Sequence, residues 1–349
     1  MNSKLLPGAE TAIKQCLNIQ NSDKLLIITD NETYEVGSAL LETAKKYSQT
    51  VLMIKIEDFT SRPVQELTYD FEQTIRSFSP TASIYAAQGH QGELHVFRTP
   101  LIRLLTKELG CRHAHMIGIT QELMLDGMSK DFNLMAQITD RVYNKVTAAE
   151  EITAQDEFGT NITFTLDPQN LKWVKDNGII GKGEMHNLPA GELFTVPYTA
   201  DGSVVAWELG DWMCKEYDEL NSPIKIEIAD GMITSATPMN TGDTKSTEAS
   251  GVFMNYVSQF DNGKRVGELG LGTLVGLNKF VGNLLQDEKF PGLHVAFGHP
   301  FAEETGADWD CPSHIDVITK RATITIVKSD GTKETIMKSG IYSDEILKG

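Results

Sequence analysis

The stretch KLLIITDNETYEVGSALLETAKKYSQTVLMIKI, residues 24–56, sets the fold class of the first part of the chain. Its ends, residues 24–30 and 50–56, are short apolar runs with the composition of strands buried on both faces. Residues 35–47 lie between them and predict a helix. A strand, a helix and a second strand in this order are typical of a parallel sheet covered by helices.

The same alternation continues to about residue 148. Residues 82–87 and 115–119 predict two more buried strands, and the amphipathic segment 100–109 between them predicts a helix. A further predicted helix, residues 130–148, closes this half. We therefore expect an α/β, Rossmann-like domain with a parallel sheet over residues 1–148.

The second half has a different pattern. Residues 161–166 alternate with period two, and residues 203–209 resemble a strand. Two Asp-Gly turns, at 230–231 and 330–331, predict hairpins that join 224–228 to 232–236 and 322–327 to 332–336. Helices are expected between the strands, for example near 246–260. We therefore expect an α+β, mixed or antiparallel domain over residues 149–349, and this domain carries the chemistry.

Composition limits the classes of function. The chain has 349 residues and a net charge of −17, so nucleic acid and anionic membranes are poor partners. The four cysteines are far apart in the sequence and suggest neither disulfides nor a zinc-binding cysteine cluster. The sequence shows no signal peptide and no apolar run of transmembrane length. We expect a cytoplasmic protein.

Four segments of the second half carry candidate chemistry. In the expected strand CPSHIDVI, residues 311–318, His314 and Asp316 point to one face, because side chains alternate along a strand. His294 opens a stretch of small residues. Glu268 and Glu192 stand beside glycines and apolar runs, where an unpaired carboxylate is costly. Each segment alone also fits a structural role: a surface His–Asp pair, a satisfied histidine, or an acid at a turn.

Taken together, these five residues form a donor set rich in carboxylates. Oxygen and imidazole ligands suit a pair of divalent cations such as Zn, Mn, Co or Fe(II), and paired cations support hydrolysis. His186 and His299 lie near the acidic segments and are candidate groups that contact the substrate or the ligands. A rival pair, His113 and His115, has no acidic partner in a recognisable motif, and we interpret it as structural.

At these residues the sequence resembles the aminopeptidase T / aminopeptidase S (PepS) family of metallo-aminopeptidases, the thermophilic metalloprotease type. The similar blocks are NLPAGELFTVP (187–197), RVGELGLGT (265–273), GNLLQDEKFPGLHVAFG (282–298) and SHIDVI (313–318), in the family's order. The resemblance implies that Glu192, Glu268, His294, His314 and Asp316 bind two metal ions, with Glu192 or Glu268 also moving a proton. It further implies a homodimer that removes N-terminal residues from short peptides.

The chain departs from the family in two respects. It is shorter than the typical member, and Phe301 stands where the family has a tyrosine, a candidate transition-state donor; Tyr198 or His299 is a possible substitute. In its shorter length the chain also resembles the 2,5-dihydroxypyridine dioxygenases, which hold one Fe(II) with two His and one Asp. That branch loses the first glutamate and has His at the second, whereas this chain keeps Glu192 and Glu268.

Three classes of function therefore stay open. The first is a metallo-aminopeptidase in which a metal-activated water attacks the scissile carbonyl. The second is a related metalloenzyme, such as an Fe(II) ring-cleaving dioxygenase or an amidase. The third is a binding protein that has kept the fold without the activity.

Overall fold

The computed structural model describes residues 2–210, 212–217 and 219–349. The chain forms two compact units. The first comprises Met1–Ala136 and Gly178–Ala190, and the second comprises Gln137–Asn177 and Gly191–Gly349. Residues 178–190 thus belong to the first unit although they follow residue 148 in the sequence.

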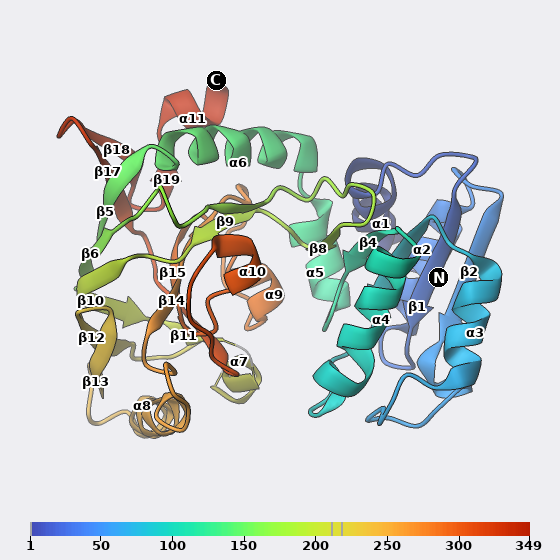
Figure 1. Ribbon diagram of the computed structural model, residues 1–349, viewed down its shortest axis with the longest axis horizontal. Helices are drawn as coiled ribbons and strands as arrows, with labels where there is room; N and C mark the ends of the chain where they lie inside the picture. Colours follow the sequence, from blue (N-terminus) through green and yellow to red (C-terminus); the bar gives the residue numbers. More distant parts are fainter. Residues whose placement is uncertain (1, 211, 218) are drawn as a thin grey trace. The chain divides into compact units, whose positions relative to one another are not determined.

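The first unit contains a parallel five-stranded sheet with the order β2-β1-β3-β4-β8 (Figure 1). Its strands are β1 (Lys24–Thr29), β2 (Thr50–Lys55), β3 (Ala82–Ala86), β4 (Arg112–His115) and β8 (Met185–Asn187). The strand predicted at 115–119 is wrong, because β4 ends at His115 and the backbone turns at Gly118, which has a φ of 69°. The apolar run at 116–119 supplies buried side chains in a turn.

Helices pack against this sheet. Leu26 and Ile28 of β1 share a core with Phe71 and Leu101, which come from α3 and α4. The α-helices are α1 (Leu6–Glu10), α2 (Tyr34–Ala44), α3 (Tyr69–Phe78), α4 (Thr99–Arg103) and α5 (Gln121–Leu125). Shorter 3-10 or π-helical segments span Ser3–Leu5, Thr11–Cys16, Ile56–Asp58, Leu94–Arg98, Leu104–Glu108 and Gly127–Ser129. The helices predicted at 35–47 and 100–109 are therefore present, the second as α4 and the π-helical segment after it.

The second unit contains two antiparallel sheets. The eight-stranded sheet has the order β13-β12-β10-β6-β5-β17-β18-β19, and the six-stranded sheet has the order β11-β16-β15-β14-β9-β7. The strands of the first are β5 (Ala149–Gln155), β6 (Asn161–Thr165), β10 (Thr199–Ala206), β12 (Ile224–Ala229), β13 (Met232–Pro238), β17 (Thr323–Lys328), β18 (Lys333–Lys338) and β19 (Ile341–Tyr342). Those of the second are β7 (Val174–Asp176), β9 (Glu192–Thr195), β11 (Glu208–Leu209), β14 (Val266–Gly272), β15 (Gly292–Gly298) and β16 (His314–Ile318).

Both predicted hairpins and the mixed fold class are confirmed. The turn between β12 and β13 places Asp230 and Gly231 at positive φ, 50° and 72°, as a tight two-residue hairpin turn requires. Apolar side chains of both sheets share one core, for example Ile152 and Phe164 with Leu269 and Val317.

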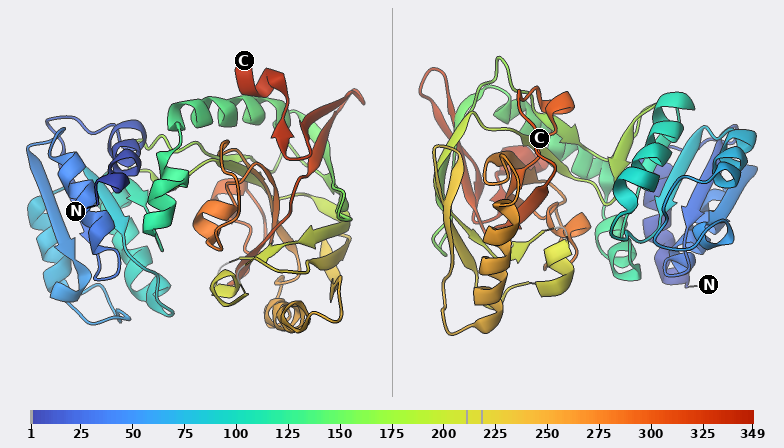
Figure 2. Two further views of the ribbon diagram at one scale, coloured as in Figure 1. Left: turned by 180° about the vertical axis from the view of Figure 1, so that it is seen from behind. Right: turned by 60° about the horizontal axis from the view of Figure 1, so that its bottom comes forward.

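The helices of the second unit lie around these sheets. They are α6 (Phe132–Val146), which begins in the first unit, α7 (Trp212–Tyr217), α8 (Thr244–Val257), α9 (Leu284–Asp287), α10 (Ala302–Thr305) and α11 (Asp344–Lys348). Figure 2 shows α8 beside the β12–β13 hairpin, with which it makes its main contacts. The C-terminal helix α11 lies along α6, where Arg141 donates to the carbonyl of Ile346 (Figure 1).

Candidate metal centre

The five predicted ligands lie on four neighbouring strands of the six-stranded sheet. In the strand order β16-β15-β14-β9, the first strand carries His314 and Asp316 and the second carries His294. The third strand carries Glu268, and the fourth carries Glu192. Glu268 pairs with Ala296, and Ala296 pairs with Asp316, so that these side chains project from one face of the sheet. The opposite face carries Leu269, Val295 and Val317 into the core. Residues far apart in the sequence are thereby brought together by strand pairing.

Small residues make room on the ligand face. Gly270 pairs with His294, and a Cβ atom at Gly270 would lie 1.8 Å from the Nε2 atom of that histidine. A Cβ atom at Gly272 would lie 2.0 Å from the carbonyl oxygen of Phe290. The imidazole of His294 and the loop before β15 therefore lie directly over backbone that only glycine leaves open. The glycines of the motif RVGELGLGT have this steric role.

Three of the predicted ligands form a compact donor group. One donor atom each from Glu192, Glu268 and His294 lies within 4.8 Å of the other two, and this is the only such group among the described residues. The Nε2 atom of His294 lies 3.1 Å from Oε1 of Glu268 and 3.4 Å from Oε2 of Glu192. Ligands about 2.1 Å from a tetrahedral ion are about 3.4 Å apart. The spacing therefore fits a shared cation.

The remaining two predicted ligands lie on the other side of Glu268. The Nε2 atom of His314 is 3.6 Å from Oε2 of Glu268 and 3.5 Å from Oδ2 of Asp316. Glu268 thus directs one oxygen toward His294 and the other toward His314. The Nδ1 atom of His314 lies 2.9 Å from the carbonyl oxygen of His299. A hydrogen bond to that carbonyl places the proton on Nδ1 and leaves Nε2 for a metal.

The electrostatics of the cluster favour a bound cation. Burial raises the pKa of Glu192 to about 8, against the opposing charge of Lys289. Burial disfavours the charged imidazoles, yet the hydrogen bond to Glu268 and the charge of Glu192 raise the pKa of His294 to about 9. Asp316 likewise outweighs burial and raises the pKa of His314 to about 10. Buried carboxylates thus stabilise any positive charge placed among them, and the donor set fits a divalent metal.

Two charged residues of this cluster are not singled out by the sequence. The Lys289 side chain is fully buried, and its Nζ atom lies 2.5 Å from Oε1 of Glu192 and also contacts the Glu288 carboxylate. Burial raises the pKa of Glu288. Both residues belong to the block GNLLQDEKFPGLHVAFG. Nothing in the local sequence pattern indicates that they are buried, so the sequence predicts ordinary surface charges.

The positions of the other candidate site residues differ. Phe301 caps α10 at a φ of 49°, and its ring centroid lies 4.9 Å from that of His314 and 4.8 Å from that of His299. The His299 Nε2 atom lies 3.3 Å from Oδ1 of Asp310. His186 belongs to β8 in the first unit. Their predicted roles as groups that contact substrate or ligands stay predictions.

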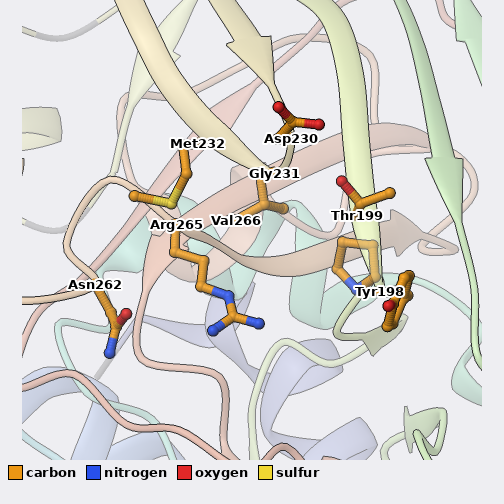
Figure 3. Close-up of a pocket in the computed structure, with 9 residues that line it drawn as sticks. Tyr198, Thr199, Asp230, Gly231, Met232, Asn262, Arg265 and Val266 are labelled. Atoms are coloured by element: carbon orange, nitrogen blue, oxygen red, sulfur yellow. The ribbon is translucent and has the colours of Figure 1, made fainter.

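Tyr198 lies in a separate surface feature. Its side chain is 69% exposed and lines a pocket of about 200 Å³ together with Arg265 and Asn262 (Figure 3). None of the five predicted ligands lines this pocket. No contact between Tyr198 and the donor cluster therefore supports the idea that Tyr198 takes over the role of the family tyrosine.

The rival histidine pair forms an internal network in the first unit. The Nδ1 atom of His113 lies 2.8 Å from Oγ of Ser83, and its Nε2 atom lies 3.2 Å from Nδ1 of His115. The ring of His115 stacks on that of Tyr85 at 4.9 Å. These contacts support the structural interpretation of the pair.

A mixed α/β fold that gathers buried carboxylates and imidazoles on one sheet face offers the donor set of a metal centre rich in oxygen ligands. The family model for thermophilic metalloproteases (M29) matches residues 130–342, which is more than half of the chain. The chain belongs to this family, as its sequence motifs predict. It is thus a member of a family of metal-dependent peptidases.

Solved structures share the fold across nearly the whole chain. The 2,5-dihydroxypyridine dioxygenase of Pseudomonas putida KT2440 is 14% identical, with a TM-score of 0.70, and the alignment covers 100% of this chain and 99% of that one. Wild-type AmpT of Thermus thermophilus is 15% identical, with a TM-score of 0.68, and the alignment covers 97% and 98%. No curated protein sequence matches significantly. Within the described residues, no helix has both the length and the apolar character needed to span a bilayer.

Proposed function

We propose that this protein is a metal-dependent aminopeptidase that releases N-terminal residues from short peptides. The observation that carries this proposal is the placement of Glu268, whose two oxygens face His294 on one side and His314 on the other. This carboxylate can be shared between two ligand positions, one completed by Glu192 and the other by Asp316. Divalent ions such as Zn, Mn, Co or Fe bound there would polarise a carbonyl and activate water at neutral pH.

The residues of the chain have separate tasks in this proposal. Glu192, Glu268, His294, His314 and Asp316 hold the metal ions, two in the form that the sequence predicts. The buried carboxylates also attract the positively charged α-amino group of a peptide. Glu192 or Glu268 is the group that would also move a proton to the leaving amine. As in the sequence analysis, we also propose that the protein is cytoplasmic and forms a homodimer.

The test is release of amino acids from Leu-p-nitroanilide and from a dipeptide panel. The protein is stripped with a chelator, dialysed, and reloaded with Zn, Mn or Co. We expect Glu268→Gln to lose metal and to lower kcat/KM by at least roughly 10²-fold. The matched control is Glu157→Gln, because Glu157 is exposed and pairs with Arg321 outside the centre; it should leave both quantities unchanged.

Two results would contradict the proposed activity. The first is a metal-loaded protein that releases no amino acid from the whole panel. The second is consumption of oxygen and opening of 2,5-dihydroxypyridine by the Fe(II)-loaded protein, which would favour the dioxygenase alternative.

A further inference from the structure

Lys289 is the one fully buried lysine among the described residues, and it lies inside the donor cluster. Burying an ammonium group is costly unless partners satisfy it. Here the Nζ atom lies 2.5 Å from Oε1 of Glu192 and also contacts the Glu288 carboxylate. Lys289 therefore supplies a positive charge to the same carboxylates that a metal ion would neutralise.

The backbone holds Lys289 firmly in place. Its amide donates to the carbonyl of Gln286 at 2.9 Å, and its own carbonyl accepts from Leu274 at 3.0 Å. Asp287, two residues earlier, accepts from the amides of Val281 and Asn283 at 2.9 and 3.0 Å. The turn between α9 and β15 is thus fixed by hydrogen bonds, and the lysine enters the cluster from a rigid base.

The contacts of Glu192 divide between its two oxygens. Oε1 accepts from Lys289, and Oε2 lies 3.4 Å from Nε2 of His294. The lysine thus turns one oxygen of Glu192 away from the compact donor group and leaves the other in it. Glu192 would therefore hold a metal ion through a single oxygen.

We propose that Lys289 is a positioning residue and a built-in counter-cation of the metal centre, which stabilises the metal-free cluster and competes with the ion for the charge of Glu192 and Glu288. The inference rests on the proposed metal centre and deepens it. An internal cation lowers the repulsion among the carboxylates when no metal is bound. The same cation makes the cluster bind metal less tightly than its donors alone would. Lys289 therefore sets the metal affinity.

The test compares the affinity for Zn²⁺ of the wild type and of Lys289→Met, which has a similar length and no charge. Removal of a positive charge so close to the ion should lower the dissociation constant for Zn²⁺ by on the order of tenfold or more. The metal-free variant should unfold at a lower temperature, and its gain in Tm on metal binding should be larger than that of the wild type. The matched control is Lys320→Met, because Lys320 pairs with Glu219 outside the cluster; it should change neither quantity.

The proposal is overturned if folded Lys289→Met binds Zn²⁺ with unchanged or weaker affinity. Should that variant fail to fold, Glu288→Gln and the double variant Glu288→Gln/Lys289→Met allow the same comparison, since the double variant removes one charge of each sign. Tighter binding by the double variant than by Glu288→Gln supports the proposal, and equal or weaker binding overturns it. A wild type that binds metal but cleaves no peptide refutes the proposed activity alone.

Discussion

Phe301 is the residue whose chemistry departs most clearly from the resemblance. Its ring lies edge-on to His314, with a centroid distance of 4.9 Å, so the position of the missing phenol is next to a predicted ligand. The half-buried side chain packs against the neighbouring rings of Phe194 and His299. In the proposed aminopeptidase, a hydroxyl group at this position would be a candidate donor to the negative charge that develops on the substrate carbonyl.

Phe301→Tyr is therefore expected to raise kcat for dipeptide hydrolysis by up to roughly 10²-fold, since one oxyanion donor contributes on that order. Metal content should stay the same. Phe301→Leu serves as the control and should show no gain. Steady-state kinetics of the metal-loaded proteins measure the effect, and a tyrosine variant no faster than the leucine variant would refute this role.

His113 makes a second prediction at the residue scale, on stability. Burial lowers its pKa to about 3, below the ordinary value of about 6.5. As the pH falls below about 6.5, the unfolded chain takes up a proton that the folded protein refuses, so stability is lost until the folded pKa is reached. At pH 5 this amounts to about 2 kcal/mol for one histidine.

We expect His113→Asn to lose less Tm than the wild type between pH 7 and pH 5, although it is less stable at pH 7. His95→Asn is the control, because His95 is exposed, and it should follow the wild type. Thermal unfolding monitored by circular dichroism measures both. Equal losses of Tm in wild type and His113→Asn would show that this histidine is not a source of acid sensitivity.

The strands β14 and β15 are the elements on which the centre depends. Gly270 and His294 are directly paired, and the imidazole occupies the space of the missing Cβ atom. Since a backbone cannot yield easily in the middle of a sheet, an added methyl group must displace the ring.

Gly270→Ala should therefore weaken Zn²⁺ binding by at least roughly tenfold, because His294 loses its position in the donor group. Gly251→Ala in α8 is the matched control, since a Cβ atom there meets nothing within 4 Å. Competition with a chromophoric chelator measures both affinities. An alanine variant that folds and binds zinc as tightly as the wild type would contradict the steric role of Gly270.

At the element scale, the sequence predicts most of the architecture. Periodicity and Asp-Gly turns identify both hairpins, and alternation in SHIDVI places His314 and Asp316 on one face. The strand predicted at 115–119 fails because a buried apolar run looks alike in a strand and in a turn. The position of β8 also escapes, because its parallel pairing with β4 is a long-range contact that no local pattern encodes.

The donor set is similarly predictable in part. Glu192 and Glu268 stand out because acids among glycines and leucines are unusual, whereas Lys289 and Glu288 look like any charged pair. Their burial depends on the loop that lies over Gly272, which is a tertiary effect. The sequence therefore predicts the ligands better than it predicts the groups that balance their charge.

At the scale of the whole molecule, metal binding should stabilise the second unit by mass action. An ion at 100 times its dissociation constant adds about 2.7 kcal/mol, and a unit of this size gains about 2–4 °C per kcal/mol. We expect chelation to lower Tm by roughly 5–10 °C and zinc to restore it. Calorimetry measures the shift, and Glu268→Gln should show little response to metal. Identical Tm values for chelated and zinc-loaded wild type would count against a metal centre in the core of this unit.

Metal binding by the cluster on the six-stranded sheet underlies both the proposed activity and the proposed role of Lys289. The most direct measurement is an anomalous difference map, recorded at the zinc edge, from a crystal of the zinc-loaded protein. We expect a peak among Glu192 Oε2, Glu268 and His294, within bonding distance of all three. Zinc peaks elsewhere, with none within reach of these donors or of His314 and Asp316, would contradict this expectation.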